Sequence, residues 1–264
     1  SLITPRTRAI VAVHHAGVAC DMNAIGKLAA AHDLHVGEDN AHGLFGQYHG
    51  RNLGTFGALA TQSFHETKNI SCGEGGALLI NDQRYIERAE IIREKGTNRS
   101  QVFRGQTDKY SWLDIGSSFL PSDMLAGFLL GQLEARVQIQ TRRHAIWNRY
   151  RAQLTALSTR HGFGLPCVPA DREHPAHCFY LMLRSTEQRQ RLIDHLKADG
   201  ILAVFHYLPL HLSVMGQRFG GRPGQCPVTE HVSDCLVRLP LYNSLSSAEQ
   251  DDVIASIHAF FGDA

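Results

Sequence analysis

The chain has 264 residues, of which 43% are hydrophobic and 19% are charged, and this mix excludes an intrinsically disordered chain. Lys and Arg number 26 against 25 Asp and Glu, so the net charge of +1 gives no support for binding to nucleic acid. No apolar run approaches the roughly 18 residues of a membrane span, and the N-terminus lacks the apolar core of a signal peptide. We therefore expect a cytoplasmic globular protein of one large domain or two modest ones.

The six cysteines and sixteen histidines predict neither disulfides nor a metal centre. No two cysteines stand in C-x-x-C spacing, and six are too few for a disulfide scaffold, so we expect reduced thiols. Pairs such as His14-His15 suggest a metal, but no H-E-x-x-H motif and no Cys/His ligand spacing accompanies them. We expect no metal, and a metal-dependent enzyme built on the histidines stays open as an alternative that metal analysis would test.

The first half of the chain predicts strands that alternate with helices. The apolar run at 8–13 indicates a buried strand, and Asp21 can cap a helix whose apolar residues recur at helical spacing. A second strand is predicted at 34–38, with Asp39 at its end. This β-α-β order is typical of a parallel sheet with crossover helices. Further strands are predicted at 58–64 and 76–80, and an amphipathic helix is predicted at 85–95.

The second half of the chain predicts a long helix followed by a smaller domain. The polar, glycine-punctuated stretch 96–116 indicates a long ordered loop, which in a compact domain is usually functional. A helical pattern begins after Pro121-Ser122 and runs with a break to about Leu157. The domain boundary is placed on this helix, which gives a first domain at 1–140 and a small α+β domain at 141–264. The second domain is expected to contain strands at 178–183 and 201–207 and helices at 186–199 and 247–261.

Two polar residues stand where open α/β sheets bind their ligands, beyond the carboxyl ends of the strands. Asp39 closes one predicted strand, and Lys68 follows another. A lysine whose pKa is lowered can form a Schiff base. An aspartate can pair with the protonated pyridine nitrogen of pyridoxal 5′-phosphate (PLP) and keep that cofactor an effective electron sink. Taken alone, each residue also has an ordinary interpretation, as a solvated surface lysine and as a helix cap or turn residue.

The residues around these two positions resemble the sugar aminotransferases of PLP fold type I, the DegT/DnrJ/EryC1/StrS family. The matching stretches, in the family's order, are V-H-H-A-G at 13–17, E-D-N-A-H-G at 38–43, S-F-H-E-T-K at 63–68, G-E-G-G at 73–76 and H-Y-L-P-L-H at 206–211. The resemblance covers essentially the whole chain. It implies an α/β fold of PLP fold type I, with a partial large domain built on a mostly parallel sheet and a smaller C-terminal α+β domain.

Carried over residue by residue, the resemblance implies a PLP site. Lys68 matches the lysine that forms the Schiff base, Asp39 matches the partner of the pyridine nitrogen, and Ser63 matches a serine that hydrogen-bonds the cofactor phosphate. His42 matches a Gln or His near the phenolic oxygen of the cofactor. Ser118 falls where many relatives have an Asn that reaches the phosphate of the partner subunit.

The resemblance leaves two histidines and one glycine cluster with two interpretations each. His14 and His206 lie in segments that in the family are near the active site, which implies a substrate-binding role. The other interpretation of each is a strand-end histidine satisfied by the backbone, and the sequence does not separate the two. For the glycines at 73–76 we favour a turn before a strand over a role at the cofactor.

The stretch 91–118 resembles the dTDP-4-amino-4,6-dideoxygalactose transaminases within the family. That resemblance implies transfer of an amino group from L-glutamate to a nucleotide-sugar, dTDP-4-dehydro-6-deoxy-D-glucose. The product, dTDP-4-amino-4,6-dideoxy-D-galactose, would serve lipopolysaccharide or enterobacterial common antigen biosynthesis. Family members are homodimers with active sites at the subunit interface, so a homodimer is expected, with neither nucleic acid nor membrane as a partner.

The match begins part-way into the large domain of the family. No counterpart appears of the Gly-Thr turn that holds the cofactor phosphate, and we expect uncovered sheet edges. A catalytically incompetent fragment or pseudo-enzyme of the family therefore stays open as the alternative. A sugar dehydrase of the same fold is a further alternative, but that branch has histidine where this chain has Lys68.

Overall fold

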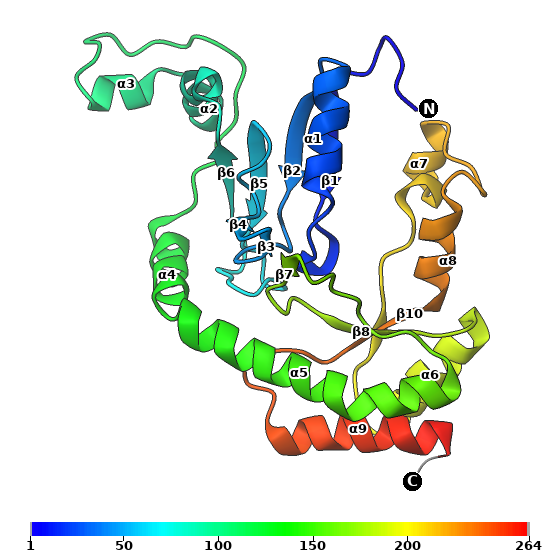
Figure 1. The fold of residues 1–264 in the computed structure, drawn as a ribbon. Helices are drawn as coiled ribbons and strands as arrows, with labels where there is room; N and C mark the ends of the chain where they lie inside the picture. Colours follow the sequence, from blue (N-terminus) through cyan, green and yellow to red (C-terminus); the bar gives the residue numbers. More distant parts are fainter. Residues whose placement is uncertain (1, 263–264) are drawn as a thin grey trace. The chain divides into compact units, whose positions relative to one another are not determined.

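The structure, a computed structural model, describes residues 2–262 and divides the chain into two compact units (Figure 1). The first unit runs to Gln138 and includes Pro169–Pro175, and the second comprises Ile139–Val168 and the chain from Ala176 onward. The predicted division at residue 140 differs from this in one respect. No pattern in the sequence predicts the short return of 169–175 to the first unit.

The first unit is built on a four-stranded sheet in the order β1-β2-β5-β6 (Figure 1). β1 (Ala9–Val13), β2 (His35–Asp39) and β5 (Leu59–Ser63) are parallel, and β6 (Gly76–Ile80) is antiparallel to β5. The crossover helix α1 (Met22–Ala31) joins β1 to β2, and it begins where the Asp21 carboxylate accepts a hydrogen bond from the backbone of Ala24. The predicted α/β class with a mostly parallel sheet is confirmed.

The two faces of this sheet differ in burial. Ala12 and Glu38 point to the face on which α1 packs, and both are buried. Val11 and Val13 point to the opposite face and are 65% and 52% exposed. Because successive residues of a strand alternate between faces, Asp39 shares the open face with these valines. β1 is also an edge strand of this sheet.

A second, small sheet ties the returning segment to the first unit. Its strand order is β4-β3-β7, and its members are β3 (Gln47–Tyr48), β4 (Arg51–Asn52) and β7 (Arg172–Glu173). The remaining helices that begin in this unit are two one-turn helices, η1 and η2, and four α-helices: η1 (His15–Gly17), η2 (Gln83–Tyr85), α2 (Ile86–Arg93), α3 (Arg99–Phe103), α4 (Asp123–Glu134) and α5 (Arg136–His161).

The stretch 96–116 is not the plain loop that the sequence predicted. It contains α3, and it folds back so that Thr97 pairs with Trp112 in an isolated antiparallel bridge. The helix predicted from 122 onward is present, and its break lies at Ala135, between α4 and α5.

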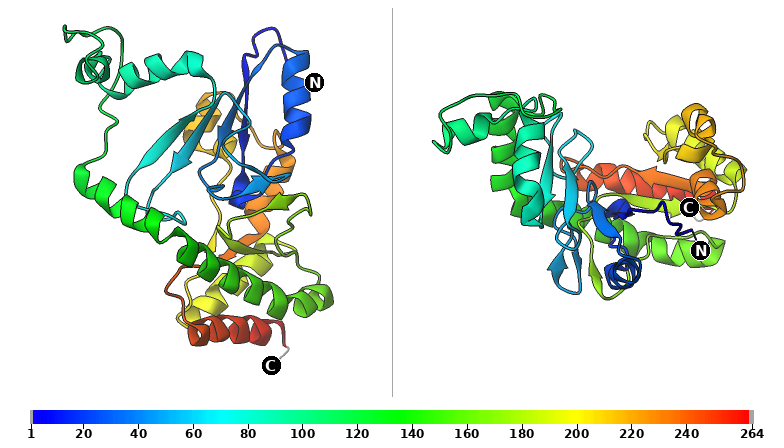
Figure 2. Two further views of the ribbon diagram at one scale, coloured as in Figure 1. Left: turned by 60° about the vertical axis from the view of Figure 1, so that its left-hand side comes forward. Right: turned by 90° about the horizontal axis from the view of Figure 1, so that it is seen from above.

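The second unit packs helices against a three-stranded antiparallel sheet in the order β8-β10-β9. α5 and α9 run side by side in it, as Figures 1 and 2 show, and the Gln250 side chain of α9 donates to the Ile146 carbonyl of α5. Its elements after α5 are β8 (Phe179–Met182), α6 (Thr186–Ala198), β9 (Val204–Phe205), η3 (Leu210–Leu212), α7 (Val214–Arg218), α8 (Pro227–Cys235), β10 (Leu236–Leu239) and α9 (Ser247–Phe261).

The core of the second unit is formed by fully buried side chains such as Tyr150, Leu154, Phe179 and Ile257. The predicted strand at 201–207 is reduced to two residues, and β10, the central strand of the sheet, was missed. Among residues 2–262, no helix is both long and apolar enough to cross a membrane.

Candidate functional site

The carboxyl ends of β2 and β5 bring two of the predicted residues to one face of the sheet. Asp39 lies opposite Thr61 in the parallel register, and Ser63 lies two residues farther along β5. A spacing of two keeps Ser63 on the face of Thr61 and Asp39, because side chains alternate along a strand. The fold therefore places a carboxylate and a hydroxyl together at the edge where parallel sheets bind ligands.

Local hydrogen bonds hold the Asp39 side chain and leave one of its oxygens available. Oδ1 accepts from the backbone N–H of Ala41 at 3.0 Å, and no group in the described part of the chain donates to Oδ2. The backbone carbonyl of Asp39 accepts from the N–H of His14 at 3.1 Å. Asp39 is half-buried, so its carboxylate is oriented by the protein and still accessible.

Lys68 lies in the turn that connects β5 to β6. The backbone N–H groups of Phe64 and Cys72 donate to Gly75 and Phe64 respectively, which extends the hairpin beyond the strands, and the N–H of Lys68 donates to His65. The turn is anchored at its far side, where the buried Asn69 amide donates to the Pro175 carbonyl at 2.6 Å. The Lys68 side chain, which is half-buried, thus starts from a fixed backbone just beyond the carboxyl end of β5.

The structure gives the turn conformation of the glycines at 73–76 and the hydrogen bonding of Ser63. Gly73 has a φ of +85°, a conformation that glycine adopts without strain, and this supports the interpretation of 73–76 as a turn. The Ser63 hydroxyl oxygen accepts from the backbone N–H of His65 at 3.3 Å. Within residues 2–262 the Ser63 hydroxyl donates to no acceptor, so it can donate to a ligand.

His42 lies three residues after Asp39, and a backbone contact sets its tautomer. Its Nδ1 accepts from the N–H of Ala16 at 3.3 Å, so the neutral ring carries its proton on Nε2. The ring of His15 packs edge-on against it, with centroids 5.8 Å apart. His42 can therefore donate a hydrogen bond through Nε2.

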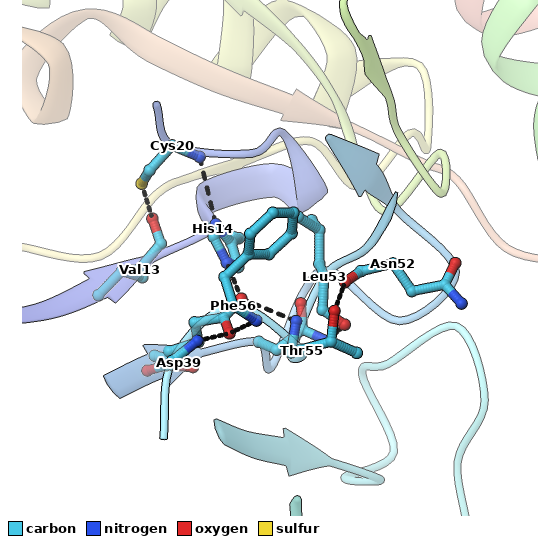
Figure 3. Close-up of polar contacts among 12 residues, drawn as sticks. Val13, His14, Cys20, Asp39, Asn52, Leu53, Thr55 and Phe56 are labelled. Atoms are coloured by element: carbon cyan, nitrogen blue, oxygen red, sulfur yellow. Dashed lines mark hydrogen bonds and ion pairs between the residues drawn. The ribbon is translucent and has the colours of Figure 1, made fainter. Parts of the chain in front are cut away.

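The structure contradicts the substrate-binding role predicted for His14. The side chain is completely buried, with Nε2 3.0 Å from Oε2 of Glu38, and Nδ1 accepts from the N–H of Cys20 at 3.2 Å (Figure 3). Burial by itself lowers the pKa of His14, whereas the Cys20 side chain and the Glu38 carboxylate raise it. A ring with no exposed surface and both nitrogens engaged is part of the interior.

Glu38 is the residue at this end of the sheet that motif reasoning missed. Its carboxylate accepts from the backbone N–H groups of Gly54, Phe56 and Gly57 at 2.8, 2.6 and 2.7 Å, besides its contact with His14. Burial raises the pKa of a carboxyl group, but these hydrogen bonds favour the charged form by more and lower the pKa of Glu38 below its usual value. The signal was present in the alternation of β2, which directs neighbouring residues to opposite faces.

Two further predicted residues lie elsewhere in the fold. Ser118 is exposed and pairs with Glu94 in an isolated antiparallel bridge. His206 belongs to the second unit, where it follows β9 and its ring lies 5.2 Å from that of Tyr207. The roles of both stay predictions. No three His, Cys, Asp or Glu side chains gather as a possible metal site in the described residues.

The chain is similar in sequence to proteins of a known family. Residues 1–258 match the model of the DegT/DnrJ/EryC1/StrS aminotransferase family. The chain is 33% identical over 257 residues to the dTDP-3-amino-3,4,6-trideoxy-alpha-D-glucose transaminase of Streptomyces venezuelae. This match covers 97% of this chain and 64% of that protein. The chain is 31% identical to the spore coat polysaccharide biosynthesis protein SpsC of Bacillus subtilis, over 97% of this chain and 67% of that protein.

The fold comparison agrees with the sequence comparison. The crystal structure of Streptomyces venezuelae DesV in complex with a ketimine intermediate superposes with a TM-score of 0.86 at 32% identity, over 98% of this chain and 66% of that one. The chain thus spans about two thirds of the length of these relatives. With a matching family model, relatives above 30% identity and the same fold, the chain belongs to the DegT/DnrJ/EryC1/StrS aminotransferases, a family of enzymes that depend on PLP.

Proposed function

We propose that this protein uses PLP to transfer an amino group from L-glutamate to a nucleotide-linked keto sugar. The observation that carries the proposal is the grouping of Asp39 and Ser63 on one face of the sheet, with Lys68 in the turn directly beyond β5. Family membership supports the reaction class. Neither a plain turn lysine nor a plain strand-end aspartate would account for the three together.

The side chains fit PLP in their hydrogen-bonding chemistry. Asp39 offers a carboxylate oxygen that accepts no other hydrogen bond in the described residues, which suits a protonated ring nitrogen. The Ser63 hydroxyl can donate to a phosphate oxygen. His42, whose neutral ring has its proton on Nε2, can donate to the phenolic oxygen. Lys68 supplies the amine that would hold the cofactor covalently.

PLP, when bound, supplies an electron sink for the carbanion that transamination requires. Asp39 would hold the ring nitrogen protonated while negative charge develops, because its carboxylate is fixed by Ala41 and does not need to reorganise. After the amino donor has displaced Nζ from the cofactor, the freed amine of Lys68 would take a proton from the α-carbon of the donor as a base and deliver it to the cofactor as an acid.

The substrate we infer is dTDP-4-dehydro-6-deoxy-D-glucose, and the inferred product is dTDP-4-amino-4,6-dideoxy-D-galactose. The S. venezuelae relative is named for a dTDP-amino sugar and the B. subtilis relative for a coat polysaccharide, which supports a nucleotide sugar destined for a surface glycan. The position of the amino group and a role in lipopolysaccharide or enterobacterial common antigen biosynthesis rest on the resemblance of 91–118. His206 is assigned to the sugar substrate because its segment, 206–211, matches one that lies near the active site in the family.

We also propose that the active protein is a homodimer. The segment 103–130 carries large apolar side chains that are more than half exposed, which a second subunit would cover: Phe103, Trp112, Ile115, Phe119, Met124 and Phe128. Ser118 lies within this segment. A Ser118 hydroxyl that reaches the phosphate bound by the partner subunit fits the exposure of this residue.

A borohydride trap tests the cofactor site. The protein is incubated with PLP and reduced, and the pyridoxyl group is then mapped by mass spectrometry. We expect the label on Lys68 alone, loss of labelling and turnover in Lys68→Ala, and unchanged labelling in the control Lys27→Ala, which alters an exposed lysine of α1. Absence of a label, or scattered labelling, would favour the fragment or pseudo-enzyme alternative.

A further inference from the structure

The buried carboxylate of Glu38 has no task in the function proposed above. It is 2% exposed and lies on the covered face of β2, with His14 as its side-chain partner. Burying a charge is unfavourable unless it is fully hydrogen-bonded, and four donors surround this one. This buried carboxylate is adjacent in the chain to Asp39, the residue proposed to contact the ring nitrogen of the cofactor.

We propose that Glu38 and His14 form a brace that positions Asp39 for its role at the ring nitrogen of the cofactor. Glu38 and His14 are then positioning residues, because neither would touch the cofactor. This inference rests on the proposed function and extends it by two residues on the opposite face of the sheet.

Two links connect the brace to Asp39, one through a hydrogen bond and one through the backbone. His14 contacts Glu38 through its ring and donates its backbone N–H to the carbonyl of Asp39, so one residue of the β1 end holds both members of the pair. Glu38 and Asp39 share a peptide unit and point to opposite faces. A rotation of the strand end that moves the Glu38 carboxylate therefore moves the Asp39 carboxylate in the opposite direction.

The brace also fixes the strand end from its other side. The N–H groups of Gly54, Phe56 and Gly57 belong to the loop just before β5, the strand that carries Ser63. Figure 3 shows this loop, at Thr55 and Phe56, beside His14 and Asp39. Glu38 thus connects the end of β1 to the loop that leads into β5, across β2.

Hydrogen exchange on the cofactor-free protein tests the first half of the proposal. The amides of Ala41 and His14 both donate to Asp39, so their exchange rates report its position. In Glu38→Gln and in His14→Gln we expect both amides to exchange at least tenfold faster. In the control Asp21→Asn, which alters a carboxylate of the same unit bonded to Ala24 and Tyr48, we expect wild-type rates at these two amides. Wild-type rates at both amides in the two brace variants would overturn the proposal.

Spectroscopic titration with PLP tests the second half. We expect Glu38→Gln to weaken PLP binding about tenfold, as is typical when a residue that orients a ligand group is lost. It should also shift the pH midpoint of the bound cofactor's absorbance in the direction that Asp39→Asn shifts it. If Glu38 acts through Asp39, Glu38→Gln has no further effect on that midpoint in the Asp39→Asn background.

The outcomes separate this inference from the proposed function. Faster exchange at Ala41 and His14 together with no PLP binding by the wild-type protein would refute the proposed function and retain the link between the brace and Asp39. A Glu38→Gln variant that melts earlier but binds PLP with the wild-type constant and spectrum shows a structural role only, and that would refute the brace.

Discussion

Asp39 and Glu38 show how neighbouring carboxylates can take opposite tasks. Glu38 faces the covered side of the sheet and receives every donor it needs from the protein. Asp39 faces the open side and keeps one oxygen that accepts no hydrogen bond from the described residues. The difference follows from the two-residue period of a strand, which turns adjacent side chains to opposite faces. The carboxylate suited to a ligand is therefore the less buried of the two.

Replacing Asp39 by Asn should remove the charge that favours a protonated ring nitrogen and keep the shape of the side chain. We expect kcat for transamination to fall by about a hundredfold or more, the usual cost of removing a preorganised electrostatic group. Borohydride labelling of Lys68 should persist in this variant, because the lysine is untouched. Steady-state kinetics with L-glutamate check the prediction, and a kcat within threefold of wild type would contradict it.

The acid side of the stability profile should report Glu38. The pKa of Glu38 is lower in the folded protein than its ordinary value near 4.5, so the carboxylate stabilises the fold above that pH. This stabilisation is lost as the pH falls through the folded-state pKa. We expect Glu38→Gln to be less stable than the wild type at pH 6, and we expect the difference between their free energies of unfolding to shrink as the pH falls below about 4.5.

Denaturant unfolding at several pH values provides the check, with Glu66→Gln as the control. Glu66 is an exposed carboxylate of the same unit, and its replacement should leave the pH profile nearly unchanged. A difference between wild type and Glu38→Gln that stays constant from pH 7 to pH 3 would show that the charge of Glu38 is not involved.

At the scale of elements, the loop 54–57 depends on glycines because the backbone of β2 lies close to it. A Cβ atom at Gly57 would lie 2.5 Å from the carbonyl oxygen of Val36 and 3.2 Å from Cα of Gly37. Gly54 has a φ of +87°, where a side chain is strained. The close approach is what lets the N–H groups of this loop reach Glu38.

Gly57→Ala should therefore push the loop away from β2 and destabilise the protein by about 1–3 kcal/mol, the usual cost of overpacking. Gly26→Ala is the matched control, because nothing lies within 4 Å of its Cβ in α1. Alanine there should stabilise the helix by about 0.5–1 kcal/mol. Thermal or denaturant unfolding of the two variants measures both, and equal effects of the same sign would contradict the close-approach argument.

At the scale of the whole molecule, the two units differ in how well each covers its own apolar surface. The second unit has a continuous core in which Leu154, Leu181 and Ile257 are fully buried. The first unit leaves one face of its sheet open and carries the exposed apolar segment 103–130. Exposed apolar area of this kind marks a surface that another chain covers.

The segment 103–130 should therefore control self-association. In Ile115→Lys/Phe119→Lys we expect the dissociation constant of the dimer to rise at least tenfold, because two charges would be buried without partners. Phe219→Lys, which alters an 86% exposed side chain of the second unit, is the control and should leave the dimer intact. Sedimentation over a range of concentrations checks this, and a dimer unaffected by the double substitution would contradict the assignment.

The sequence by itself determined the local elements and the candidate residues of the site. Asp21 as a helix cap, the strands around Asp39 and Ser63, and the break in the long helix all follow from patterns within a few residues of each other. Lys68, Asp39 and Ser63 are predicted as PLP residues because their motifs resemble those of the family to which the chain belongs.

Only the tertiary structure decided what depends on residues distant in the chain. β10 was missed because its four residues are held by pairing with β8 and β9, more than thirty residues away on the β9 side and fifty on the β8 side, and not by a local signal. The His14 side chain is buried because it contacts the buried carboxylate of Glu38. Glu38 lies 24 residues later in the chain, so no local pattern predicts this contact. Burial and hydrogen-bond partners are set by the packing of the whole chain. They distinguish the buried pair of Glu38 and His14 from the accessible carboxylate of Asp39.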